Sequence, residues 1–240
     1  MKSRRQLSNS PITESIVEYQ FQPFITLNEE LIANWNIKPN YVIKPVYGHQ
    51  TTIQFDTSNI QQITNEEKLI TSVDLINEEQ GFTIKCLNDR FAVIKYRPYQ
   101  NLENLKSEFD YYWQQYNESF SPSQISRIGI RSINEIELIE PLSHYVKNKV
   151  LPFWVKKTEK MESNTLLRYE EKVSLNIGII VHIYISFITN KLIIDIDTFS
   201  TKLFNQDSLK DISKEENELR KIKNNTFYSL ITSDYKAKCK

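Results

Sequence analysis

The chain has 240 residues, and its 40% share of hydrophobic residues is enough to bury the core of one large domain or two small ones. Its 30 basic residues are matched by 30 acidic residues, so no overall field attracts nucleic acid or an anionic membrane, and such binding would need a local patch. No stretch has the apolar run that a bilayer requires, and the basic start of the chain has none behind it. We therefore expect a cytoplasmic protein that does not bind membranes.

The first half of the chain predicts a strand, a short helix and an antiparallel meander. After a flexible arm at 1–10, residues 14–24 are typical of a strand, and residues 26–37 predict a short helix capped by Thr26. A polar linker follows. β-Branched and aromatic residues, separated by turn-like segments, then predict strands at 41–47, 51–57, 81–87 and 90–98.

A long helix is predicted after this meander, over residues 101–120. Its apolar residues recur at helical spacing and its other face is polar, which indicates a helix lying on a sheet. Stacking of nucleic acid bases on these rings is the less favoured interpretation, because amphipathic helices bury such stripes. The stripe consists of Leu102, Leu105, Phe109, Tyr112, Trp113, Tyr116 and Phe120.

The second half repeats the order of the first. Residues 124–138 predict a strand, and 141–154 contain a short helix. A second meander is predicted at 165–175, 177–187 and 191–199. A long helix follows over 207–232, in which Ser208 and Asp211 have capping-box spacing.

These elements predict an α+β fold with two similar halves, each running strand, helix, antiparallel meander, long helix. The halves span 11–121 and 124–232, and a tail covers 233–240. One continuous sheet backed by both long helices would bury both apolar stripes, although two separate domains are the alternative. No residue-level repeat demonstrates a duplication.

Five short segments carry a family resemblance, in matching order and spacing. They are residues 11–23, 97–116, 127–138, 194–199 and 224–232, of which "RIGIRSIN" is the most distinctive. In these segments the chain resembles the TIGR04255 family of bacterial and archaeal proteins. The resemblance implies a microbial protein of sporadic distribution, as is seen for mobile or defence-associated genes. It supplies no catalytic residues.

The strand at 124–138 carries the most unusual pattern, because Arg127, Gly129 and Arg131 alternate with isoleucines and so share one face. A glycine there leaves room for a group that approaches the backbone closely. The two arginines could clamp an anion through paired donors. The favoured interpretation is structural: Asp195 and Asp197, which share a face of a later strand, would pair with them across the sheet.

Two further basic residues, Lys95 and Arg97, flank Tyr96. With Arg127 and Arg131 they are our candidates for a surface that binds nucleotide or nucleic acid, and such binding would weaken steeply with salt.

A metal site is the least supported interpretation of the acidic strand. Asp195 and Asp197 could share a hard cation, but no further acidic or histidine pattern completes a coordination shell. We therefore predict no metal and no cofactor. The two cysteines, Cys86 and Cys239, lie outside any Cys-x-x-Cys pair, which excludes a thiolate zinc site and favours reduced thiols.

Catalytic motifs are missing from the sequence. It has no nucleophile elbow, phosphate loop, dinucleotide fingerprint or His-Glu-x-x-His helix, and His182 within "IIVHIYI" is more typical of a satisfied core imidazole than of a catalytic base. We therefore expect a binding or regulatory protein without catalytic residues, acting through a protein partner, such as a neighbouring component of a bacterial defence or toxin-control module. A nucleic-acid or nucleotide sensor is the alternative, and a metal-dependent hydrolase comes last. The apolar stripes would also allow a homodimer.

Overall fold

The computed structural model describes residues 10–56, 61–98, 101–147, 149–150, 164–186, 188–205 and 208–239, without the side chains of 49–56, 61–68 and 209. The strands are β1 (Ile12–Gln22), β2 (Val42–Asp56), β3 (Gln61–Asn77), β4 (Phe82–Leu87), β5 (Arg90–Tyr96), β6 (Gln124–Glu137), β7 (Thr165–Lys172), β8 (Ile177–Ser186), β9 (Lys191–Ser200) and β10 (Phe204–Asn205). The helices are α1 (Glu29–Ala33), α2 (Leu102–Phe120), α4 (Leu209–Leu230) and α5 (Ser233–Lys238), with a 3₁₀ turn, η1 (Leu142–His144).

The strands form one antiparallel sheet, and the strands of both halves are arranged in it by the same rule. The order is β2-β3-β4-β5-β1-β6-β9-β8-β7, with β10 beside β6. From the central pair β1 and β6 outward, each half places its first strand, then the last strand of its meander, then the earlier ones in reverse. Because β1 pairs with β6 along most of its length, the halves share one sheet. The predicted α+β fold with a continuous sheet is confirmed.

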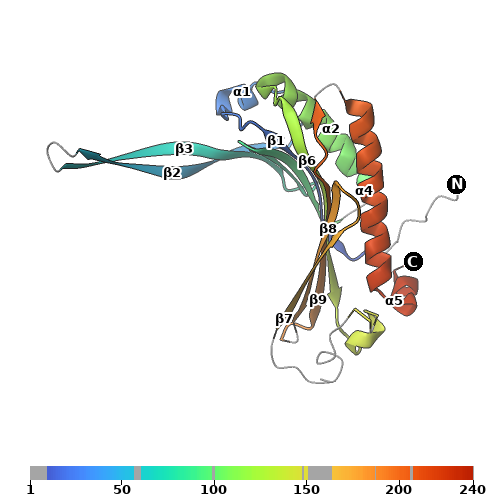
Figure 1. Ribbon diagram of the computed structural model, residues 1–240. Helices are drawn as coiled ribbons and strands as arrows, with labels where there is room; N and C mark the ends of the chain where they lie inside the picture. Colours follow the sequence, from blue (N-terminus) through green and yellow to red (C-terminus); the bar gives the residue numbers. More distant parts are fainter. Residues whose placement is uncertain are drawn as a thin grey trace.

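The two long helices cover the same face of this sheet (Figure 1). Helix α2 packs over β5 and β1, and α4 over β9 and β6. The predicted aromatic stripe of α2 is core: Phe109, Tyr112 and Tyr116 are fully buried, and Phe109 lies edge-on to Tyr19 of β1 at 4.6 Å between ring centroids. Burial of so much aromatic surface makes this layer the main apolar core.

Charged side chains interrupt the buried stripes of both helices. Glu108 of α2 accepts hydrogen bonds from Lys38 Nζ at 2.5 Å and Tyr41 Oη at 2.7 Å. Glu216 of α4 accepts one from Tyr19 Oη at 2.6 Å and pairs with Lys106 at 2.8 Å. Each buried carboxylate thus has the partners that its desolvation requires.

Lys223 is the exception on α4, because its side chain is 4% exposed and has no carboxylate partner in the described part of the chain. Burial, together with the nearby charge of Arg220, lowers the pKa of its ammonium group from 10.5 to about 8. A buried, unpaired ammonium destabilises the fold when it is protonated.

The predicted cap of the first short helix is wrong, because a contact from a distant part of the chain moves the start of the helix. The first short helix is capped by Asn28, whose side chain accepts from Glu30 N at 2.9 Å, not by Thr26. Asn88, in the turn between β4 and β5, accepts hydrogen bonds from the backbone of Ile25 and Leu27, so the helix begins later than its sequence pattern indicates.

The turn-like segment predicted between the strands at 41–47 and 51–57 lies inside β2, and residues 61–77, for which no element is predicted, form β3. Gly48 is paired with Leu69 just past a register shift, and a Cβ on Gly48 would lie 2.7 Å from Thr71 Cγ2. The glycine therefore permits a close strand contact at a bulge. The resulting β2–β3 hairpin projects far beyond the rest of the sheet (Figure 1).

The expected tail contains helix α5, which is capped by Thr232 Oγ1 accepting from Tyr235 N. Tyr235 packs on Tyr145 at 5.4 Å between ring centroids, and Cys239 is buried.

Further back in the chain, the short helix expected within 141–154 is only the single turn η1, and residues 151–154 lie outside the described residues. Ser208 is the N-terminal cap residue of α4, but its side chain makes no capping hydrogen bond.

Candidate functional site

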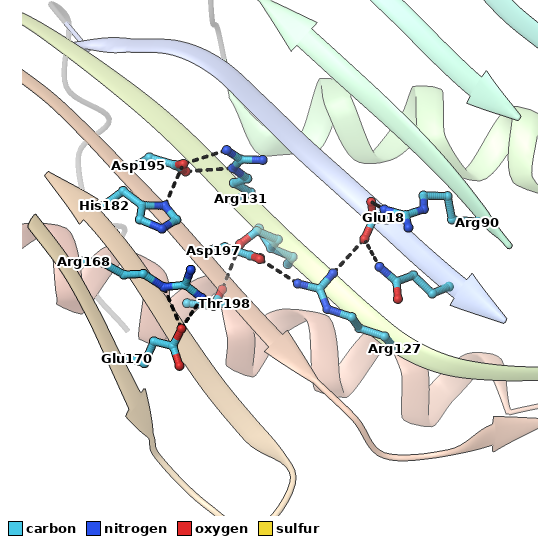
Figure 2. Close-up of polar contacts among 12 residues, drawn as sticks. Glu18, Arg90, Arg127, Arg131, Arg168, Glu170, His182, Asp195, Asp197 and Thr198 are labelled. Carbon is cyan, nitrogen blue, oxygen red and sulfur yellow. Dashed lines mark hydrogen bonds and ion pairs between the residues drawn. The ribbon is translucent and has the colours of Figure 1, made fainter. Parts of the chain in front are cut away.

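The face of the sheet away from α2 and α4, called the open face here, carries a network of charged side chains (Figure 2). Arg127 and Arg131 project from β6, Asp195 and Asp197 from β9, and Glu18 from β1. All of them alternate with residues that point into the helix-covered core, as a strand with one buried face requires. The predicted charge pairs between β6 and β9 are present.

Arg131 and Asp195 form a two-pronged pair. Arg131 Nε donates to Asp195 Oδ1 at 2.8 Å and Nη2 donates to Oδ2 at 2.6 Å. These bonds raise the pKa of the Arg131 guanidinium above its ordinary value. His182 Nδ1 lies 3.5 Å from the same carboxylate (Figure 2). His182 is thus half-buried beside a carboxylate, with its imidazole held at the rim of the network.

Arg127 bridges the two halves of the protein. Its Nη1 donates to Glu18 Oε1 at 2.7 Å and its Nη2 to Asp197 Oδ2 at 2.6 Å, so one guanidinium joins β1 to β9 across β6. Glu18 is also 3.5 Å from Arg90. Burial raises the pKa of Asp197 above its ordinary value, and the nearby Arg127 opposes that rise. The carboxylate is therefore desolvated and depends on Arg127 for its charge.

Glycines on two strands create the space in which Arg127 lies. A Cβ on Gly129 would lie 2.6 Å from Arg127 Nη1, and one on Gly178 would lie 2.6 Å from Phe199 Cζ. Arg127 in turn lies 4.7 Å from the centroid of the Phe199 ring. Gly129 thus makes room for the arginine two residues earlier on the same strand, and Gly178 makes room for the Phe199 ring.

We expect Gly129→Ala to destabilise the fold by about 1 kcal/mol, because the new methyl group would push Arg127 away from Glu18. Urea unfolding measures this change. In an Arg127→Ala background the same substitution should cost less than about 0.5 kcal/mol, since nothing remains to be displaced. Equal costs in both backgrounds would show that Gly129 serves another purpose.

The other two candidate anion-binding residues lie elsewhere, so the four predicted residues do not form one surface. Lys95 lies on the helix-covered face, donates to the carbonyl of Gln80 and sits 4.8 Å from the Phe82 ring centroid. Arg97 donates to the carbonyls of Pro11 and Glu135 at 3.3 Å, beyond the end of β5. The alternation of β5, which puts Lys95 in phase with buried Phe91 and Val93, separates it from Arg127 and Arg131.

The acidic pair does not complete a metal site. Asp195 and Asp197 each accept hydrogen bonds from a different arginine. Within the described ranges, no group of three or more histidine, cysteine or acidic side chains is placed to hold a metal ion. In the described part of the network, donors and acceptors thus satisfy one another.

A hollow of about 500 Å³ lies where the halves meet on the helix side, between α2 and α4. Its charged walls are also paired within the protein: Lys106 lies 2.6 Å from Asp110, and Arg220 donates to Glu103 at 2.7 Å. The hollow thus lies in the cleft between the two halves.

Sequence reasoning missed Glu18, His182 and Phe199 as members of the network. Each lies on the correct face by alternation, but its neighbours depend on which strands are adjacent and in which register.

Comparison with protein-family models found no match, and neither the curated proteins nor the solved structures contain a match to this chain. The resemblance to the TIGR04255 family stays a prediction. No helix in the ranges described above is both long and apolar enough to cross a membrane.

Proposed function

We propose that this chain is a binding protein that holds a protein partner on the open face of its sheet. In the part of the chain that the structure describes, the helices lie on one side only, and the sheet bends away from them. The β2–β3 hairpin and the far ends of β7 and β9 project on the open side (Figure 1). A concave face that the helices leave uncovered has room for a folded partner.

The balanced charges of the open face favour a protein partner over nucleic acid. Cations of the open face pair with carboxylates from the same sheet, as in Arg127 with Glu18 and Asp197, Arg131 with Asp195, Arg90 with Glu18, Lys85 with Asp74, and Lys191 with Glu135. The affinity of a protein for phosphate groups comes from cationic side chains that neutralise the phosphates and so release their counterions. Here the guanidiniums would first have to leave their carboxylates.

Apolar side chains lie between these ion pairs. They are half-buried by their neighbours, and no helix in the described ranges covers them: Ile16, Ile133, Ile180, Tyr184, Ile193 and Phe199. A mixture of apolar surface, aromatic rings and internally neutralised charge is the composition of protein–protein interfaces. A product of a neighbouring gene in a defence or toxin-control module is the partner class that the family resemblance suggests.

The test is affinity purification from the native host, with and without nuclease, followed by mass spectrometry. We expect one protein partner that survives nuclease treatment, and about a tenfold lower recovery with Tyr184→Ala, because central tyrosines carry much of the energy of an interface. Leu31→Ala is the matched control, since Leu31 is 41% exposed on α1, away from the open face. A partner lost equally with both variants, or lost on nuclease treatment, contradicts the proposal.

A further inference from the structure

Strand β7 is the last strand of the sheet among the described residues. It pairs with β8 in unbroken register from Thr165 to Lys172, without a bulge or a proline. The other edge strand, β2, carries Pro45 and a register shift after Val46, both of which hinder pairing with a further strand. In the described part of the chain no strand pairs with the outer side of β7. Its outward N–H and C=O groups are therefore available to another strand.

The side chains of β7 are unusually exposed for a strand of this composition. Leu166 is 64% exposed and Tyr169 is 54% exposed. Arg168 and Glu170 form an ion pair with each other on the open-face side, and both are more than half exposed. An exposed, regular edge that bears apolar and aromatic residues is a surface on which strands associate.

We propose that β7 pairs with β7 of a second copy of this chain, antiparallel, about a two-fold axis at Tyr169. Along the edge of a strand, every second residue points its N–H and C=O groups outward, and in an antiparallel pair such a residue must face another one of the same kind. In a two-fold symmetric pair of identical strands, one residue must therefore lie opposite the same residue of the other copy. The choice is therefore among a few centres along the strand.

The charges along β7 favour one of the three central positions, Arg168, Tyr169 and Glu170. With Arg168 at the axis, two arginines face each other. With Glu170 at the axis, two glutamates face each other and Arg168 faces Lys172. With Tyr169 at the axis, each Arg168 faces Glu170 of the other copy, and the two tyrosines are adjacent. Opposite charges directly across an antiparallel pair stabilise it, and like charges destabilise it. Only the Tyr169 register is self-complementary among these three.

In the resulting dimer the two open faces lie on the same side. The two-fold axis of an antiparallel pair is perpendicular to the sheet, so both helix layers lie on one side and both open faces on the other. The dimer would present two open faces in the same direction as one extended surface. A partner with repeated or two-fold symmetric sites would then bind both at once, with a gain in effective concentration. This inference does not depend on what the open face binds.

Sedimentation equilibrium of the purified full-length chain tests the proposal. We expect a monomer–dimer equilibrium whose dissociation constant rises about tenfold or more with Arg168→Glu and likewise with Glu170→Arg, because each change places like charges opposite each other twice. The double variant Arg168→Glu with Glu170→Arg restores the opposite pairs and should recover dimerisation. Lys44→Glu, an exposed charge reversal on the other edge strand, is the matched control and should change nothing.

Circular dichroism of each variant establishes that the monomer remains folded. A chain that stays monomeric at all accessible concentrations overturns the proposal. So does a dimer that is insensitive to Arg168→Glu, or one that Lys44→Glu weakens equally. Failure of the double variant to recover dimerisation, with its fold intact, would reject the Tyr169 register. None of these results bears on capture of a partner by the open face, which has its own variant, Tyr184→Ala.

Discussion

Replacing Lys223 with methionine is expected to raise the free energy of unfolding by about 3 kcal/mol at pH 7. The pKa of this buried ammonium is lowered from 10.5 to about 8, so at neutral pH the folded protein holds a desolvated positive charge. Methionine has a similar length and fills irregular core space without a charge. Urea unfolding of the wild type and Lys223→Met at a series of pH values measures the difference.

The sign of the pH dependence follows from the lowered pKa. Below pH 8 the lysine is protonated in both the folded and the unfolded state, and the full burial penalty is present. Between about pH 8 and 10.5 the unfolded state binds more protons than the folded state, so the wild type gains stability as pH rises. The advantage of Lys223→Met should therefore shrink across that window. A constant advantage at every pH would mean that packing, not charge, is responsible.

Lys221 provides the matched control, because it lies on the same helix and is exposed. Lys221→Met should change the unfolding free energy by less than about 0.5 kcal/mol.

Removal of the Arg127 guanidinium is expected to destabilise the protein by about 2 kcal/mol at pH 7. Arg127 is the cation between Glu18 and Asp197, and its side chain is 19% exposed. In Arg127→Ala the two carboxylates would be left partly buried without that cation, and loss of one partner from such a network is costly. Denaturant unfolding measures the loss. Arg168→Ala, which breaks the exposed pair with Glu170, should cost less than about 0.5 kcal/mol.

Acid should reduce the cost of Arg127→Ala. Burial already raises the pKa of Asp197, and loss of the opposing guanidinium would raise it further. A carboxyl whose folded pKa is raised binds its proton more tightly in the folded state, so the variant loses stability as pH rises from the ordinary aspartate pKa upward. The difference between wild type and variant should therefore be smaller at pH 4 than at pH 7. A difference that grows on acidification would contradict the proposed role of Asp197.

Elements whose patterns are local were predicted correctly. The helical stripe that includes Phe109 and Tyr116 is buried as predicted, because its spacing matches the turn of a helix. The alternation in β6 and β9 correctly places Arg127 and Asp197 on one uncovered face.

Other features depended on contacts that no local pattern contains. No element is predicted for residues 61–77, yet they form β3 because β2 and β4 lie on either side of it. Helix α1 begins at Glu29 because Asn88, some sixty residues later in the chain, holds the segment before it. Such long-range contacts override weak propensities.

By itself, then, the sequence determined the α+β class, the repeated order of elements and the faces of the central strands. These follow from hydrophobic periodicity, which is a property of neighbouring residues. The tertiary structure alone decided that Arg131 binds Asp195 while Arg127 joins Glu18 to Asp197, and that Lys95 lies on the opposite face. The reason is that register and strand neighbours are set by how the whole sheet packs beneath α2 and α4, and one residue of slip would exchange its two faces.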